Sequence, residues 1–465
     1  MLTDKNTARE NKEFLKENIG RLLLKFAIPV ILSMLVTEMY NMVDSLFVGQ
    51  FVGAKGLGAL TIAFPVQRLF SSLAMLVAIG TSTAISRNLG ENDYSKVRKI
   101  VPNAIIVLVA IMVFFILTIL IFNHDVIIKL GSSDNIFPYA KTYINIILLG
   151  VVFQGLSILM SYILTSFGEA KVILVSTSIG AIFNFIIDYL LVVIFNFGIG
   201  GAAIATVISQ IVAFVYTLMK FLKIKKEMNL KFEVEIDKNI YKEIIYVGFS
   251  TFIVEVSDAV VAVFLNKILL EIGGDGAIVA LGLITRVSMF LFITVIGISS
   301  AMQPIAAYNF GAGSNDRVKK IVKLSVKTVT ISSIILWAAA MIFAKQMIGI
   351  FVNDAEIIKY TARAFRIVIL LFPFIGTYYV AIYYYQAMGM ARLSLLLSIF
   401  RQIIIFIPIV YIMVYWLELG VLGAWISYPI SDIISFGISL IYIKCYQVED
   451  IVEEKVNAKR GAIIT

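Results

Sequence analysis

Apolar segments long enough to cross a lipid bilayer recur along the whole of this 465-residue chain, and they constrain its fold more than any other feature. A transmembrane helix needs about 20 consecutive, mostly apolar residues. Hydrophobic residues make up 60% of the sequence and charged residues only 15%. We therefore predict an all-α membrane protein with no soluble domain. The twelve predicted transmembrane helices span residues 22–47, 57–83, 101–122, 141–166, 172–196, 200–222, 244–270, 277–303, 324–351, 367–388, 393–417 and 421–444.

The second half of the sequence repeats landmarks of the first. Residues 88–90 (Asn-Leu-Gly) are matched 221 positions later by residues 309–311 (Asn-Phe-Gly), and the same offset carries residues 168–171 onto 389–392. Paired helical bundles are typical of transporters, because two related halves can rock about a site between them. The internal duplication thus predicts two six-helix lobes, with function at the seam between them.

Basic residues are concentrated in the terminal segments and in alternate loops, which hold 28 of the 39 Lys and Arg residues. Cytoplasmic loops carry this excess, so both termini are predicted to be cytosolic. Topology therefore explains the net charge of +9, and the scattered basic residues argue against nucleic-acid binding. The predicted organisation is a cytosolic N-terminal segment (1–21), an N-lobe (22–222), a cytosolic linker (223–243), a C-lobe (244–445) and a cytosolic tail (446–465).

Several classes of protein do not fit the sequence. One Cys (Cys445) and one His (His124) exclude an internal disulfide and a cysteine or histidine metal centre. An intramembrane enzyme would need aspartate-rich metal motifs, a catalytic His or a Ser and Lys pair, and none stands out. The first 21 residues lack the apolar core of a signal peptide. We predict a protein of the bacterial cytoplasmic membrane that is not an enzyme and needs no cofactor.

Ionisable side chains inside the predicted helices mark a candidate site in the N-lobe. Each would cost about 2.5–3.5 kcal/mol at the centre of a lipid-exposed helix, so each must face protein, pair or bind something. Polar residues at steps of three and four share one face of a helix. Three helices carry such stripes: Ser33, Thr37, Asn41 and Asp44 on the first, Thr177, Gly180, Asn184 and Asp188 on the fifth, and Ala202, Thr206 and Ser209 on the sixth.

Together these stripes offer two carboxylates, an amide and a hydroxyl. Such oxygen ligands suit a hard cation such as Na⁺, at Asp44, Asn184, Asp188 and Thr206, or a proton shared between two adjacent carboxylates. The alternative is interhelical hydrogen bonding, which we favour for Asn41 and Thr177. For Asp44 and Asp188 we favour cation binding, because joining helices needs no ionisable group. The residues leave Na⁺ and H⁺ both open.

The C-lobe carries a different set of charges. Glu255 and Asp258 share a face of the seventh helix, and Arg286 and Arg401 lie on the eighth and eleventh. These four residues form either a neutralising charge network or a second cation or substrate site. Asp432 is a predicted partner for one of the arginines.

Aromatic and methionine side chains punctuate the helices and suggest a substrate cavity. Aromatic faces bind organic cations, and Met adapts to varied shapes. Core packing and interfacial aromatic belts are the alternative explanation. The candidate cavity residues are Met34, Thr37, Asn41, Phe153, Tyr379 and Tyr383.

Four motifs resemble those of the multidrug and toxic compound extrusion (MATE) family. They are residues 42–49 (Met-Val-Asp-Ser-Leu-Phe-Val-Gly), residues 63–65 (Ala-Phe-Pro), residues 88–90 (Asn-Leu-Gly), and Asn184 placed four residues before Asp188. The resemblance covers residues 20–445 and includes the duplicated twelve-helix plan. It implies export of amphiphilic organic cations in exchange for inward Na⁺ or H⁺. Export of antibiotics in this way would confer antibiotic resistance.

The resemblance also implies roles for particular residues. The family's N-lobe cation site would be Asp44, Asn184, Asp188, Thr206 and the backbone carbonyl of Ala202. In the C-lobe, the helix 7 carboxylate is similar to Glu255, but the helix 10 carboxylate of some branches is absent. This departure favours coupling through the N-lobe.

We therefore predict a secondary active multidrug efflux transporter that works as a monomer in the lipid bilayer. Its partners would be small amphiphilic cations. The alternative is a flippase for a lipid-linked sugar on a related duplicated fold, which would need an Arg-rich groove for phosphate. Arg286 and Arg401 are the only candidate arginines for phosphate binding, and both lie in the C-lobe.

Overall fold

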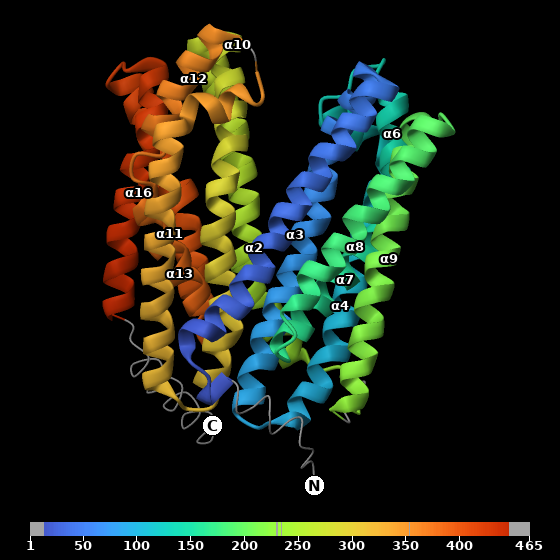
Figure 1. Ribbon diagram of the computed structural model, residues 1–465, viewed down its shortest axis with the longest axis vertical. Coiled ribbons are helices and arrows are strands. Elements are labelled where there is room, and N and C mark those ends of the chain that lie inside the picture. The colour runs from blue at the N-terminus through green and yellow to red at the C-terminus, as the bar shows by residue number, and fades with distance from the viewer. Residues whose placement is uncertain (1–13, 229–230, 234, 353, 446–465) are drawn as a thin grey trace. The chain divides into compact units, whose positions relative to one another are not determined.

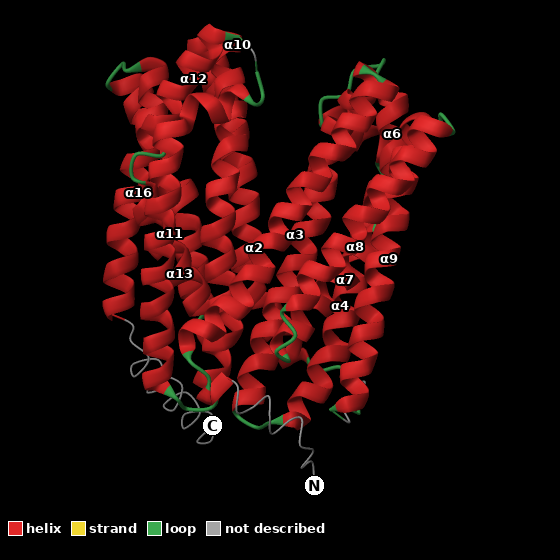
Figure 2. Cartoon of the chain, in the orientation of Figure 1, coloured by secondary structure: helices red, strands yellow, loops and turns green. Residues whose placement is uncertain are grey.

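A computed structural model describes residues 14–228, 231–233, 235–352 and 354–445. Helices make up nearly all of these residues, and none of the described residues lies in a β-strand (Figures 1 and 2). A helix satisfies its backbone hydrogen bonds internally, as the water-free core of a bilayer requires. The predicted all-α class is confirmed. The predicted tail 446–465 and most of the predicted N-terminal segment lie outside the described residues.

From residue 19 to residue 227, the described chain forms ten elements, several of which are labelled in Figure 1. They are α2 (Ile19–Phe47), the π-helix η1 (Val48–Val52), α3 (Ala54–Gly90), α4 (Tyr94–Ile121), α5 (Asn123–Lys129), α6 (Phe137–Ile147), α7 (Val151–Ser166), α8 (Lys171–Asp188), the π-helix η2 (Tyr189–Ile194) and α9 (Gly198–Glu227).

The second half forms nine elements. They are α10 (Lys238–Gly311), α11 (Asn315–Gly349), α12 (Ala355–Val368), α13 (Phe372–Met388), α14 (Ala391–Ile399), the π-helix η3 (Phe400–Phe406), α15 (Ile407–Tyr411), the π-helix η4 (Ile412–Trp416) and α16 (Gly420–Cys445).

The structure accounts for the twelve predicted spans. Within the described residues, nine helices are long and apolar enough to cross a membrane, or eleven if two bent helix pairs each count as one span. The remaining helix is the first part of α10, residues 238–273. It ends where Gly274 takes the left-handed backbone (φ +61°). A positive φ is costly for residues with a side chain, so glycine is the residue that fits this break.

Two predicted helices are bent pairs. The predicted helix 141–166 is α6 and α7, which meet at 47°, and the predicted helix 367–388 is the end of α12 followed by α13, which meet at 52°. Pro373 lies in the first turn of α13, where its missing N–H favours a new helix start. The sequence missed most of α12 because its charged residues, among them Lys359, Arg363 and Arg366, interrupt the apolar pattern.

Helix α4 shows how the fold suits lipid. Its exposed face carries Val113, Phe114, Leu117 and Ile121, whereas its one buried amide is Asn103. Large apolar side chains directed outward are costly in water and favourable in hydrocarbon. Its exposed face is therefore one that a bilayer would cover.

The described residues form two compact units. Unit 1 contains residues 14–16 and 28–248, and unit 2 contains residues 17–27 and 249–445. Each unit thus includes the first turns of the helix that opens the other half. The two exchanged segments, 17–27 and 238–248, are 221 positions apart, so the exchange follows the sequence duplication.

In unit 1 the exchanged segment crosses α3 at very short range. A methyl group at Gly248 would overlap the backbone carbonyl of Leu76, and one at Gly80 would overlap the carbonyl of Ile244. Small residues let two helix backbones approach in this way. An ion pair between the buried Arg87 and Glu243 adds a second link.

The duplication is visible in the backbone as well as in the sequence. Residues with positive φ recur at offsets of 221 or 222 positions, and the two members of each pair have similar angles. A shared backbone twist at matched positions indicates that the two halves have the same local architecture. The pairs are Gly53 and Gly274, Asn92 and Gly313, Gly168 and Gly389, Asn196 and Glu418, and Gly198 and Gly420.

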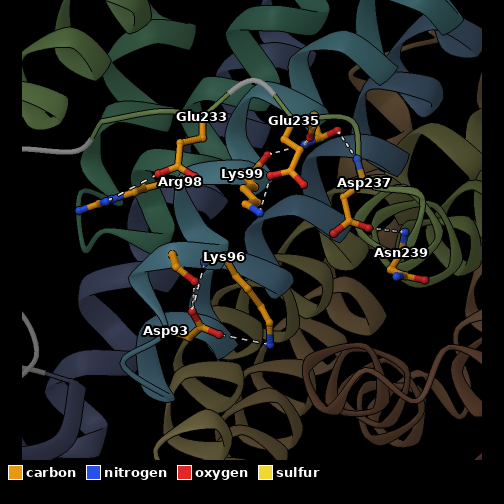
Figure 3. Close-up of polar contacts among 10 residues, drawn as sticks. Asp93, Lys96, Arg98, Lys99, Glu233, Glu235, Asp237 and Asn239 are labelled. Carbon is orange, nitrogen blue, oxygen red and sulfur yellow. Dashed lines mark hydrogen bonds and ion pairs between the residues drawn. The ribbon is translucent and has the colours of Figure 1, made fainter. Parts of the chain in front are cut away.

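The connection between the halves is shorter than the predicted linker 223–243, because α9 extends to Glu227 and α10 begins at Lys238. Its last part lies along α4 in unit 1 (Figure 3). Arg98 pairs with Glu233 at 3.8 Å, and Lys99 pairs with Glu235 at 2.5 Å. These pairs fix an extended segment on the surface of unit 1.

Asn103 of α4 anchors this extended segment through hydrogen bonds to its backbone. Its Nδ2 donates to the carbonyl of Glu235 at 2.7 Å, and its Oδ1 accepts from the backbone N–H of Asp237 at 3.4 Å. We expect Asn103→Leu to release the segment, because two backbone groups lose partners at about 1–3 kcal/mol each. Limited trypsin digestion should then cleave at Lys231 or Lys238 several times faster than in the wild type.

The control is Asn239→Leu, because Asn239 is exposed and contributes only its backbone N–H to Asp237. Equal digestion of wild type and Asn103→Leu would contradict the anchoring role.

Candidate functional site

In unit 1, the polar stripe of α2 faces two other helices. The hydroxyls of Ser33 and Thr177 share a hydrogen bond of 2.8 Å, which joins α2 to α8. The Tyr40 hydroxyl donates to Thr206 Oγ1 at 3.4 Å, which joins α2 to α9. Thr37 is exposed and donates to the carbonyl of Ser33 at 2.9 Å. The stripe therefore contains hydrogen bonds of the kind that hold helices together, with an acid at its end.

That acid, Asp44, meets Asp188 inside unit 1. Asp44 is 7% exposed and Asp188 is fully buried, and the two carboxyl groups are close enough to interact directly. Asn184, one turn before Asp188 on α8, is also buried and lies beside it. The structure thus brings Asp44, from the polar stripe of α2, next to Asn184 and Asp188, from the polar stripe of α8.

The polar atoms of this group are largely unsatisfied. Within the described residues, Oδ1 of Asp44, both carboxyl oxygens of Asp188 and Nδ2 of Asn184 are buried without a hydrogen-bond partner. A buried polar group normally has a partner, because leaving it unpaired costs about 1–3 kcal/mol and more when it is charged. Unpaired carboxyl and amide groups of this kind are able to bind a proton or a small cation.

The two remaining predicted ligands lie on α9. Thr206 is buried and within reach of Tyr40, as described above, and Ala202 is buried one turn earlier on the same helix. Residues of α2, α8 and α9 thus converge on one acidic cluster, which we define as Asp44, Asn184, Asp188 and Thr206. Helices α8 and α9 pack against one another along their length, and η1 contacts both α9 and η2.

Three further polar residues adjoin the cluster, and sequence reasoning missed them. Tyr40 and the fully buried Tyr143 of α6 both lie close enough to Asp44 and Asp188 to interact electrostatically. Gln67 of α3 donates from Nε2 to the Tyr143 hydroxyl at 3.3 Å. Tyr40 had a usable signal, since it lies one turn before Asp44. Tyr143 had none, because its approach depends on the bend between α6 and α7.

The charge balance of the cluster is negative when both acids are ionised. In the described structure, the polar groups beside the two carboxyls are Asn184, Tyr40 and Tyr143, and none of these is basic. Two adjacent carboxylates in a water-poor interior repel one another and lose hydration, so both ionise only with a cation present. The chemistry available here is reversible binding of a monovalent cation or of protons.

Unit 2 holds no equivalent cluster within its described residues. Arg401 of η3 pairs with Asp432 of α16, with Nη2 and Oδ1 3.3 Å apart, and both side chains are buried. Asp258 of α10 is exposed and accepts a hydrogen bond from Gln402. The arginine that pairs with Asp432 is therefore Arg401. Glu255 is partly buried and Arg286 is exposed on α10.

The predicted cavity residues fall into both units. Met34, Thr37 and Asn41 are on α2, and Phe153 of α7 packs against Phe214 with ring centroids 5.6 Å apart. In unit 2, Tyr379 and Tyr383 are buried one turn apart on α13. Neither unit alone brings the six residues together, and their substrate role stays a prediction.

Comparison with known proteins identifies what the chain is similar to. The MatE family model matches residues 29–190 and 247–412. The multidrug export protein MepA of Staphylococcus saprophyticus is 25% identical over 403 residues, which cover 86% of this chain and 88% of that protein. A crystal structure of MATE in the bent conformation has a TM-score of 0.90 at 21% identity and covers 98% of this chain and 100% of that one. An outward-facing multidrug resistance MATE family transporter has a TM-score of 0.87 at 22% identity, with 97% and 99% covered.

Proposed function

Since the chain belongs to the MatE family, we propose that it exports amphiphilic organic cations across the cell membrane in exchange for Na⁺ or H⁺. The observation that carries the proposal is the buried acidic cluster of unit 1, whose carboxyl oxygens have no hydrogen-bond partners in the described residues. Relatives named as multidrug export proteins support the efflux of varied compounds. No enzymatic step is part of this proposal.

The acidic cluster supplies the coupling step. Asp44 and Asp188 bind the incoming cation, with Asn184, Thr206 and the carbonyl of Ala202 as neutral ligands. Charge neutralisation changes the electrostatic and hydrogen-bonding state of α2, α8 and α9. The exchange is productive only if the coupling cation and the organic cation prefer opposite states of the protein. A cation that binds both states with equal affinity would not shift the equilibrium between them and so would drive no transport.

The energy available for transport depends on the net charge that moves in each cycle. One positive charge moving inward at 100 mV supplies about 2.3 kcal/mol, or roughly a fifty-fold gradient of exported compound. Exchange of one ion for one monovalent organic cation moves no net charge and draws on the ion gradient alone.

We propose a monomer in the cytoplasmic membrane with both termini in the cytosol.

The test uses purified full-length protein in liposomes with a fluorescent lipophilic cation as substrate. We expect dye movement when a Na⁺ gradient is imposed at fixed pH, or when a pH gradient is imposed without Na⁺, and none when both gradients are absent. The arm that drives transport identifies the coupling ion. Dye movement that is the same with and without gradients would refute coupled export.

A further inference from the structure

Arg401 is a buried cation inside a membrane-spanning segment of unit 2. The segment 391–416 is one of the apolar spans, and the Arg401 side chain is about one-tenth exposed. Its guanidinium pairs with Asp432 and lies over the rings of Phe292 and Tyr379, with its carbon 5.9 Å from each ring centroid. Residues of α10, α13, η3 and α16 therefore surround one positive charge.

The way this guanidinium is held resembles the binding of a free ion. Asp258 also acts on it electrostatically, from a side chain that is itself exposed. Within the described residues, its buried Nε has no hydrogen-bond partner. An arginine whose only role is to join helices is expected to have a hydrogen-bond acceptor for each N–H group of its guanidinium. This one is held by a carboxylate and two aromatic faces, as organic cations are.

The backbone at Arg401 has no counterpart in the other half of the chain. Arg401 lies in the π-helix η3, whereas the residues 221 positions earlier, 179–185, form regular α-helix in α8. A π-helical turn redirects side chains and is frequent at functional positions. At the repeat offsets, Arg401 matches Gly180 and Asp432 matches Gln210. The second half thus has both members of a charge pair where the first half has neither.

The two units differ in how their buried charge is balanced. In unit 1, Asp44 and Asp188 lack any basic neighbour among the described residues. In unit 2, the buried Asp432 is neutralised by a side chain of the same chain. We propose that Arg401 is a tethered cation: its guanidinium takes in unit 2 the role that the exchangeable ion takes at the acidic cluster of unit 1. This inference rests on the proposed function.

A tethered cation has a definite consequence for transport. A guanidinium fixed to the backbone cannot be exchanged, so unit 2 keeps a permanently filled cation site. The coupling ion then binds in unit 1 only. Removal of the guanidinium should leave Asp432 and the two aromatic rings as a site that needs a cation from solution.

The experiment is chemical rescue of Arg401→Ala in liposomes. We expect the variant to lose at least about fivefold in ion-driven dye efflux, the lower end of typical coupling effects. Millimolar guanidinium chloride should restore efflux along a saturating curve, because the small cation can refill the space beside Asp432. Urea, a neutral isostere of guanidinium, is the matched control and should not restore it.

Two further measurements separate a transport role from simple packing. Guanidinium should raise the thermal midpoint of purified Arg401→Ala but not that of the wild type, a readout that is independent of transport and remains valid if wild-type coupling fails. The double variant Arg401→Ala/Asp432→Asn removes the unpaired acid, so it should recover stability without recovering efflux or any response to guanidinium. Unchanged efflux in Arg401→Ala, or full efflux in the double variant, would overturn the proposal.

Discussion

Asp188→Asn should nearly abolish ion-coupled efflux while leaving the protein folded. Asparagine has the size of aspartate but carries neither a charge nor an exchangeable proton, so the buried cluster loses the ability to bind and release a cation. Asp188 is fully buried beside Asp44 and Asn184, and asparagine fits the same space. We expect a drop of roughly 100-fold in gradient-driven dye efflux in liposomes, near the upper end of typical coupling effects.

Asp44→Asn should have a similar effect, because the two carboxyls interact directly. The matched control is Asp93→Asn in the same unit. Asp93 caps α4, where its side chain accepts from the backbone N–H of Lys96 at 3.2 Å, and asparagine is an equally good cap. Its efflux should therefore equal that of the wild type. Coupled efflux retained in both Asp188→Asn and Asp44→Asn would rule out the acidic cluster as the coupling site.

Gly248→Leu should strongly destabilise unit 1. The first carbon of any side chain at this position would overlap the carbonyl of Leu76, so α3 and the start of α10 must move apart. The backbone cannot move aside as a flexible side chain can, and overpacking typically costs about 1–3 kcal/mol. Leucine is a good helix former, which leaves the steric clash as the cause. Thermal unfolding of the purified protein should show a midpoint several degrees lower.

Gly437→Leu is the control for this substitution. Gly437 lies inside α16, and a Cβ atom there would meet nothing within 4 Å. Its thermal midpoint should match or slightly exceed that of the wild type, since glycine is a poor helix former. A Gly248→Leu protein as stable as Gly437→Leu would show that the helix crossing tolerates separation.

The sequence predicted the helices well because hydropathy reports directly on contact with lipid. It failed where that signal is diluted. The charged helix α12 was largely missed. The π-helix η3 was not predicted either, because residues 400–406 lie inside one continuous hydrophobic span and hydropathy does not distinguish a π-helix from an α-helix. The exchange of residues 17–27 and 238–248 between units was also invisible, because it depends on contacts between segments far apart in sequence.

For the site, helical spacing alone predicted that Asp44, Asn184 and Asp188 belong to one cation site. Each lies on a polar stripe in an apolar helix, where polarity is costly and therefore informative. Tyr143 was not predicted because a tyrosine near a helix end is ordinary in membrane proteins. The pairing of Arg401 with Asp432 shows the same limit, since charge sign predicted that an arginine would be the partner but not which one.

The exchanged helix starts have a consequence for biosynthesis. Residues 238–248 complete unit 1 and contact α3 at Gly80. When the ribosome has just synthesised α9, this segment has not yet been made. Domains generally fold as units in the order of their synthesis, but here neither unit is composed of one continuous half. The first half therefore lacks its packing partner along α3 until translation passes Gly248. Cutting the gene within the linker should therefore give halves that are stable only when expressed together.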